Sequence, residues 1–141
     1  MPKNERFLLD THTWVWLLNG TPQIQQSPVF SRIIRAVRNT GLFLSTISVW
    51  EVAMLEAKGR IAFSTEIRSW INKAICAPGL QIVELLPEIS IDSTHLPGEF
   101  HGDPADRIIV ATARHLKCPV VTADKKIIVY AEEGFVDAVG I

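Results

Sequence analysis

Cysteine is scarce in this sequence of 141 residues. Its two cysteines, Cys76 and Cys118, lie far apart, so neither has another cysteine at the spacing of a zinc ligand pair. This pattern argues against a zinc knuckle or a disulfide scaffold. It also favours a reducing compartment, since disulfides persist mainly in oxidising ones.

An excess of charge of either sign is lacking as well. The 14 basic and 15 acidic residues leave a formal net charge of -1. Global charge therefore gives no sign of non-specific binding to nucleic acid. A nucleic-acid site would have to rest on a local basic patch, a metal ion or the charges of a partner.

Long apolar runs and a targeting segment are also lacking. No run in the sequence approaches the roughly 20 apolar residues that a membrane-spanning helix needs. The polar start, residues 1–6, does not have the charged and then apolar layout of a signal peptide. We therefore expect a cytoplasmic protein with no membrane partner.

The sequence does contain enough apolar residues, 48%, to fill the core of a single domain spanning residues 1–141. Short apolar runs alternate with stretches of helical periodicity, which predicts an α/β fold with a mostly parallel sheet covered on both faces. The predicted strands are residues 6–9, 42–44, 82–85 and 120–122, with an edge strand at 136–139.

Capping and turn residues mark the helices between these strands. A first helix contains residues 14–18 and stops at Asn19-Gly20. Ser27-Pro28 is expected to open a second helix, Ser64 to cap another, and Asp103-Pro104 to open a long one. Further helices are predicted at residues 46–58, 88–96 and 126–133.

Four acidic residues fall where a parallel sheet would bring them together. Asp10 and Asp124 each follow a predicted strand, while Glu51 and Asp106 lie early in helices that begin at the same edge. Ligands of open α/β folds bind outside the carboxyl ends of the strands. Carboxylates gathered there repel one another unless a divalent cation neutralises them. The first hypothesis is therefore a hard cation held by oxygen ligands and acting on phosphate.

Each acid also has a purely structural interpretation. Asp10 could cap the helix that follows it, and Asp124 could be a turn residue. Glu51 could close a capping box with Ser48, in which the glutamate reaches back to the N–H of the cap. For Asp103 the favoured interpretation is an N-cap followed by a proline in the first helical position.

Four segments resemble the PIN domain family, and most of all the VapC toxins of bacterial toxin–antitoxin pairs. They occur in the family's order along the chain. The Asp-Pro-Ala-Asp-Arg run and the Ser-x-x-Glu element are the most specific parts. The segments are Leu8-Leu9-Asp10-Thr11-His12, Ser45-Thr46-Ile47-Ser48-Val49-Trp50-Glu51, Gly102-Asp103-Pro104-Ala105-Asp106-Arg107 and Val121-Thr122-Ala123-Asp124.

The resemblance implies a three-layer α/β/α sandwich and a metal-dependent endoribonuclease that cleaves phosphodiester bonds with metal-activated water. It assigns one or two Mg²⁺ or Mn²⁺ ions to Asp10, Glu51, Asp106 and Asp124. It gives Asp103 a helper or capping role and Thr122 a hydrogen bond within the site. It further implies an RNA substrate, a homodimer and a cognate antitoxin that blocks the site.

Other polar residues have no assigned role. Arg107, next to Asp106, could hold a carboxylate or a phosphate. His12 and His101 lie close in sequence to the predicted site, and His101 could touch a phosphate. Arg32, Arg35 and Arg38 form a basic helical stripe whose default interpretation is a solvated face.

The four tryptophans could stack on nucleobases, although aromatic residues on short helices more often fill a core or an interface. For Trp50 and Trp70 the core or interface interpretation is favoured.

Three functions are alternatives to the nuclease. A phosphotransferase of the haloacid-dehalogenase type needs a second Asp two residues after Asp10, where this chain has His12. A receiver domain needs paired acids near the first strand, and the sequence there leaves no room for them. The remaining alternative is a catalytically inactive PIN-like module that acts by binding protein or RNA.

Overall fold

The computed structural model describes residues 4–141, and its sheet is built from five parallel strands in the order β3-β2-β1-β4-β5. Residues 1–3, part of the polar start used above to argue against a signal peptide, lie outside the described residues. The strands are β1 (Phe7–Leu9), β2 (Leu42–Ser45), β3 (Leu80–Val83), β4 (Val120–Thr122) and β5 (Ala138–Gly140).

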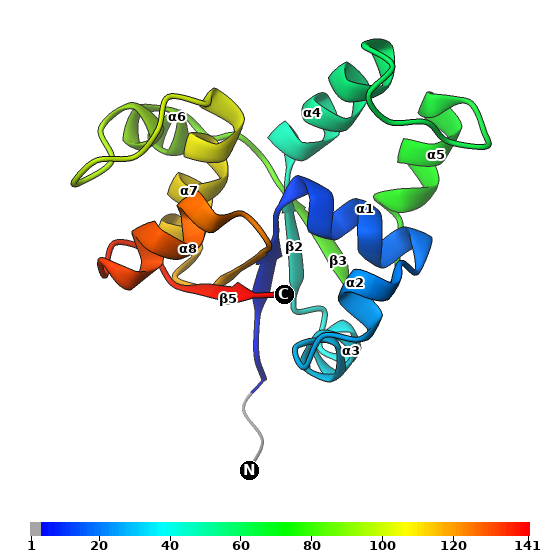
Figure 1. The fold of residues 1–141 in the computed structure, drawn as a ribbon, viewed down its shortest axis with the longest axis horizontal. Helices are drawn as coiled ribbons and strands as arrows, with labels where there is room; N and C mark the ends of the chain where they lie inside the picture. Colours follow the sequence, from blue (N-terminus) through cyan, green and yellow to red (C-terminus); the bar gives the residue numbers. More distant parts are fainter. Residues whose placement is uncertain (1–3) are drawn as a thin grey trace.

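Eight helices connect and cover these strands (Figure 1). The predicted alternation of strand and helix, and with it the three-layer arrangement, is confirmed. The helices are α1 (Thr11–Asn19), α2 (Pro22–Gln25), α3 (Phe30–Arg38), α4 (Thr46–Ala57), α5 (Ile67–Ala74), α6 (Pro87–Thr94), α7 (Pro104–Leu116) and α8 (Lys125–Glu132).

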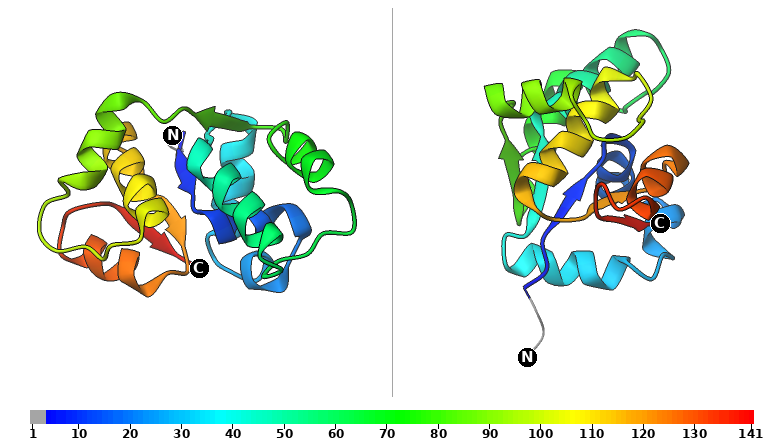
Figure 2. Two further views of the ribbon diagram at one scale, coloured as in Figure 1. Left: turned by 90° about the horizontal axis from the view of Figure 1, so that it is seen from above. Right: turned by 90° about the vertical axis from the view of Figure 1, so that its left-hand side faces the viewer.

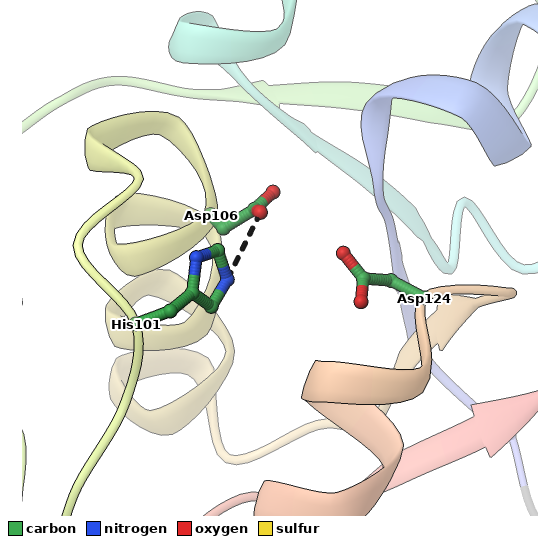
Figure 3. Close-up of side chains that lie close together, drawn as sticks. All are labelled: His101, Asp106 and Asp124. Carbon is green, nitrogen blue, oxygen red and sulfur yellow. Dashed lines mark ion pairs between the residues drawn. The ribbon is translucent and has the colours of Figure 1, made fainter.

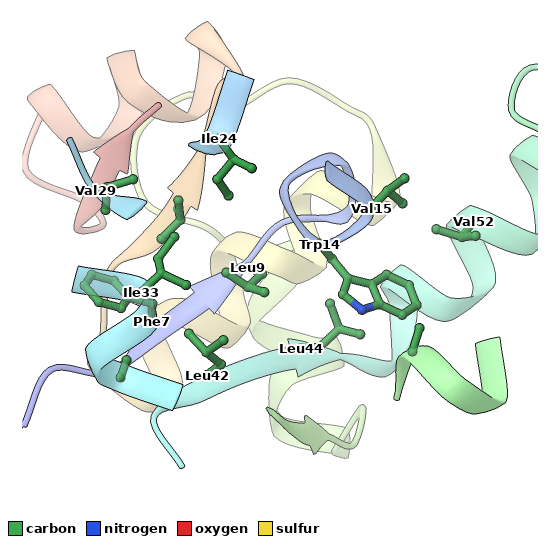
Figure 4. Close-up of a cluster of buried hydrophobic side chains, with 13 residues drawn as sticks. Phe7, Leu9, Trp14, Val15, Ile24, Val29, Ile33, Leu42, Leu44 and Val52 are labelled. Atoms are coloured by element: carbon green, nitrogen blue, oxygen red, sulfur yellow. The ribbon is translucent and has the colours of Figure 1, made fainter. Parts of the chain in front are cut away.

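The central strand β1 is buried on both faces, and its side chains alternate between two hydrophobic clusters. Phe7 and Leu9 pack with α1 to α5 around Trp14 and Ile33, as Figure 4 shows. Leu8 points to the other face and packs with α7 and α8. A strand covered by helices on both sides must be apolar at every position, which is why residues 7–9 read as a continuous apolar run.

Strand order determines where a ligand can enter. The chain leaves β1 toward β2 on one side, and returns to β4 on the other, so the order reverses between β1 and β4. The crevice beyond the carboxyl ends of strands at such a switch point is the usual ligand site of an open α/β sheet. Both Asp10 and Asp124 lie there, because Leu9 is paired with Val121 in the register of β1 and β4.

Several predicted boundaries are wrong for reasons visible in the packing. Strand β3 begins at Leu80 because it pairs with β2 from Leu42 to Ser45, two residues earlier than expected. Strand β5 begins at Ala138, two residues later than expected, because its pairing with β4 extends to Gly140, which pairs with Thr122.

Two predicted helix starts are also wrong. Helix α3 begins at Phe30, because Ser27 and Pro28 belong to a turn closed by the N–H of Phe30 on the carbonyl of Ser27 at 3.0 Å. Helix α5 is capped by Glu66 and not by Ser64, since the Glu66 carboxylate accepts the N–H groups of Arg68 and Ser69. Helix α2 was not predicted.

None of the helices formed by residues 4–141 combines the length and the apolar character that crossing a bilayer requires. The helices are short, and Figure 2 shows them arranged around the twisted sheet.

Candidate metal centre

A single open cavity of about 390 Å³ lies at the carboxyl ends of the strands. All four acids of the predicted metal site line it, together with Asp103. The remaining lining residues come from α1 and from the connection between β4 and α8. They are Thr11, His12, Trp16 and Ala123.

Asp10 is fixed by both of its carboxylate oxygens. Oδ1 accepts the backbone N–H of Thr13 at 2.9 Å, so Asp10 is the N-cap of α1. Oδ2 accepts the hydroxyl of Thr122 from β4. The residue is only 8% exposed. Each carboxylate oxygen has a further lone pair, so the cap and a metal-binding role are compatible.

Thr122 connects the two halves of the site. Its hydroxyl donates to Asp10, and it accepts the backbone N–H of Asp124 at 2.9 Å. The side chain is fully buried. Asp124 is the N-cap of α8, since Oδ1 accepts the N–H of Lys126 at 2.8 Å. One hydroxyl therefore sets the relative positions of two acids that are far apart in sequence.

Glu51 does not close a capping box. Helix α4 begins at Thr46 with Ser45 as its N-cap, which makes Glu51 the sixth residue of the helix, beyond reach of the capped end. Ser48, the expected cap, is buried and accepts the hydroxyl of Thr11 at 3.0 Å. The Glu51 side chain is half-buried and lines the cavity, so the prediction that it closes a capping box with Ser48 is wrong.

Asp103 and Asp106 lie at the start of α7. As predicted, Asp103 is the N-cap, accepting the N–H of Asp106 at 3.1 Å, and Pro104 follows as the first helical residue. Oxygens of Glu51, Asp103 and Asp106 lie within 4.8 Å of one another. A second group of atoms within 4.8 Å of one another comes from His101, Asp106 and Asp124 (Figure 3). Asp106 belongs to both groups, and Asp10 to neither.

Electrostatics identify Asp106 as the centre of the cluster. Burial, followed by the negative charges of Asp103, Asp124, Glu51 and Asp10, raises the pKa of Asp106 from 3.8 to about 7. No basic residue lines the cavity among residues 4–141. Several carboxylates facing one another without a cation are unfavourable, and a divalent ion removes that repulsion. The all-oxygen donor set fits Mg²⁺ or Mn²⁺.

His101 approaches Asp106 from the loop before α7. Its Nδ1 accepts the backbone N–H of Asp103 at 3.4 Å, which places the proton of the neutral ring on Nε2. Nε2 lies 3.1 Å from Oδ2 of Asp106 but is not aligned with it as a hydrogen bond. The sequence analysis placed His101 near the site, but it did not predict this contact with Asp106.

Arg107 does not hold a carboxylate in the described chain. Its Nε donates to the carbonyl of Ser93 at 2.8 Å, and its Nη1 donates to the carbonyls of Phe100 and His101 at 2.9 and 3.2 Å. These bonds tie the loop of His101 to α7. Arg107 therefore positions the wall of the cavity.

The basic stripe on α3 is only in part a free solvated face. Arg32 forms an ion pair with Glu5 at 2.5 Å and lies over the ring of Phe7 at 5.3 Å. Helix α3 leads into the amino end of β2, whereas the cavity lies at the carboxyl ends of the strands.

The tryptophans differ in their surroundings. Trp14 is fully buried against Trp70, with ring centroids 5.2 Å apart. Trp50 is 56% exposed, so the core interpretation is wrong for this residue. Trp16 and His12 line the cavity, a position that the sequence alone did not assign.

Comparisons with known proteins identify relatives of the whole fold. The model of the PIN domain matches residues 7–133. Ribonuclease VapC22 of Mycobacterium tuberculosis (strain ATCC 25618 / H37Rv) is 32% identical over 120 residues, which cover 85% of this chain and 88% of the relative.

Two solved structures share the fold. A chain of VapBC2 from Rickettsia felis bound to a promoter DNA fragment has a TM-score of 0.67 and 15% identity, covering 95% of this chain and 97% of that one. A chain of DNA-bound VapBC from Salmonella typhimurium has a TM-score of 0.65 and 17% identity, covering 96% and 98%.

Proposed function

This chain belongs to the PIN domain family, and we propose that it is a metal-dependent endoribonuclease whose active site is the acidic cavity. The observation that carries the proposal is the convergence of Asp10, Glu51, Asp106 and Asp124 on one cavity. Its relative at 32% identity is named a ribonuclease. We also propose that residues 1–141 form one domain, since all five strands belong to one sheet.

We assign the four carboxylates to one or two Mg²⁺ or Mn²⁺ ions. Asp106 is shared by the two groups of ligand atoms, which accommodates either number. When bound, such ions supply charge stabilisation and an activated water to phosphodiester hydrolysis. Metal binding requires deprotonated carboxylates, so protons compete with the ion at Asp106.

The residues around the carboxylates have supporting roles. Thr122 holds Asp10 and the start of α8 in register, and Asp103 fixes the first turn of α7. An RNA phosphate is repelled by the metal-free cavity, because its lining is acidic. The phosphate can enter once cations have neutralised the carboxylates.

We propose that the biological role is that of a toxin. VapBC toxin–antitoxin complexes share the fold, and the family resemblance implies a cognate antitoxin and a homodimer. The cytoplasm is proposed as the location because the two cysteines lack the pattern of a disulfide scaffold. Exposed apolar residues such as Trp50, at 56%, and Ile91, at 60%, provide contact area for a protein partner.

Metal-dependent cleavage of total RNA, with mapping of the cut ends, tests the proposal. Wild type is expected to cut with Mg²⁺ or Mn²⁺ and to stop when EDTA is added. Asp10→Asn is expected to abolish cleavage without unfolding the chain, because Asn is as good an N-cap as Asp. Asp92→Asn, an exposed acid on α6, serves as the matched control.

Cleavage by Asp10→Asn at the wild-type rate contradicts the assignment of the site. The alternative is a catalytically inactive PIN-like module. It is favoured if the wild-type protein binds a partner tightly but cuts no RNA with either metal.

A further inference from the structure

One wall of the acidic cavity is aromatic, and the metal chemistry does not use it. His12 and Trp16 line the cavity beside Asp10, Glu51 and Asp106. They are four residues apart on α1, so they lie on the same face of the helix. His12 is exposed and Trp16 is half-buried.

Trp16 differs from its neighbour Trp14 in a way that core packing does not explain. Trp14 is fully buried between α1 and α5, where it contacts Trp70. Trp16 also touches the hydrophobic core, yet part of its ring faces the cavity. Packing against the core holds this large ring in place, and its open part lies beside a charged site. Such a ring offers a surface on which a ligand can bind.

The two rings do not cover each other. Their centroids are 6.1 Å apart and their planes are inclined by 54°. The tilt excludes face-to-face stacking of the two rings, and part of the Trp16 side chain is open to the cavity. The His12 imidazole offers one donor and one acceptor to the edge of such a ring.

We propose that His12 and Trp16 form a nucleobase subsite, in which the base next to the bound phosphate stacks on Trp16 and meets His12 at its edge. The inference rests on the proposed function and names the side chains that receive the base. A cavity of about 390 Å³ is in the range of pockets that enclose small ligands. Only an unpaired base can leave its neighbours and enter it, because paired bases remain stacked within the duplex.

The test measures binding of a short single-stranded oligoribonucleotide of mixed sequence to the full chain carrying Asp10→Asn, which prevents cleavage. Adding Trp16→Ala is expected to weaken binding by about 5- to 150-fold, the range found when a stacking aromatic residue is removed. Trp50→Ala is the matched control. Trp50 is 56% exposed but does not line the cavity, and its replacement is expected to leave binding unchanged.

An oligonucleotide with abasic residues separates stacking from phosphate binding. It is expected to bind more weakly than the intact one when Trp16 is present, and equally weakly when Trp16 is replaced. If Trp16→Ala does not fold, Trp16→Phe decides the question. RNA is expected to quench tryptophan fluorescence in wild type and in Trp50→Phe, and to lose most of this quenching in Trp16→Phe.

The two proposals fail in different ways. If wild type cleaves RNA, but Trp16→Ala binds as tightly as Trp50→Ala and Trp16→Phe keeps the quenching, the base subsite is wrong and the nuclease stands. If wild type cleaves no RNA with Mg²⁺ or Mn²⁺, the proposed function is wrong and the subsite is overturned with it.

Discussion

Replacing Asp106 by Asn is expected to stabilise the metal-free protein while removing its metal site. Asp106 is the acid whose charge the fold tolerates least, because burial and four neighbouring carboxylates raise its pKa from 3.8 to about 7. Its side chain is only 21% exposed, so solvent screens this cost weakly. The amide of Asn has a similar shape and carries no charge.

The sign of the pH dependence follows from the direction of the shift. The folded chain binds the proton of Asp106 more tightly than the unfolded chain does. Stability of the metal-free wild type therefore falls as the pH rises from about 4 to about 7, and stays low above that range. The rise from 3.8 to about 7 corresponds to about 4 kcal/mol, at about 1.4 kcal/mol for each pH unit.

Urea unfolding in EDTA measures this effect. At about pH 8, Asp106→Asn is expected to be more stable than wild type by up to about 4 kcal/mol. At about pH 4, where the wild-type carboxyl is protonated in the folded chain and about half ionised in the unfolded chain, the difference is expected to fall below about 1 kcal/mol. The exposed acid Asp92, changed to Asn, is the control and is expected to show neither effect.

Metal narrows this difference in stability. A cation at about 100 times its Kd adds about 2.7 kcal/mol to the protein that binds it. Wild type is expected to gain this stabilisation with Mn²⁺, and Asp106→Asn to gain little. The electrostatic reasoning is refuted if the variant is no more stable than wild type in EDTA at about pH 8, or if its advantage is the same at about pH 4.

Three further substitutions test how the site is held together. Asp10→Ala is expected to unfold at lower urea than Asp10→Asn, by about 1 kcal/mol, because Ala cannot cap α1; equal midpoints would contradict the capping role. Thr122→Val removes a buried hydroxyl that donates to Asp10 and accepts from Asp124. It is expected to cost about 1–3 kcal/mol in thermal or urea unfolding and to weaken Mn²⁺ binding, whereas Thr122→Ser restores both, and the reasoning fails if Val and Ser behave alike. Arg107→Lys is expected to expose the loop of residues 93–101 to limited proteolysis, because a lysine cannot reproduce the guanidinium bonds to three carbonyls; unchanged cleavage of that loop would show that these bonds do not hold it.

Local signals in the sequence were sufficient for much of the fold. The three residues of β1 are covered on both faces, which makes them a continuous apolar run that can be recognised without a structure. Helix α7 begins where Asp103 and Pro104 predict, because capping depends on residues only a few positions apart. The exposed edge strands β3 and β5 were misplaced by two residues, because their limits are set by pairing with a neighbour and not by their own apolar character.

The candidate site, like the fold, was predicted where local signals were sufficient and not where long-range contacts decide. The sequence nominated Asp10, Glu51, Asp106 and Asp124 because each lies near the end of a strand or the start of a helix. It did not decide whether Glu51 was a cap, since Ser45 and Ser48 compete for the start of α4 and burial of Ser48 against Thr11 decides between them.

What the sequence determined by itself was the alternation of elements and the positions of the acids along the chain, because periodicity and capping act over a few residues. Only the tertiary structure decided which side chains share a cavity. The reversal of strand order between β1 and β4 brings Asp10 beside Thr122. It also brings Asp10, Glu51 and Asp124 close enough to raise the pKa of Asp106, and α1 turns Trp14 into the core and Trp16 toward the acids. Contacts of this kind depend on distance in space, which the spacing of residues along the chain does not record.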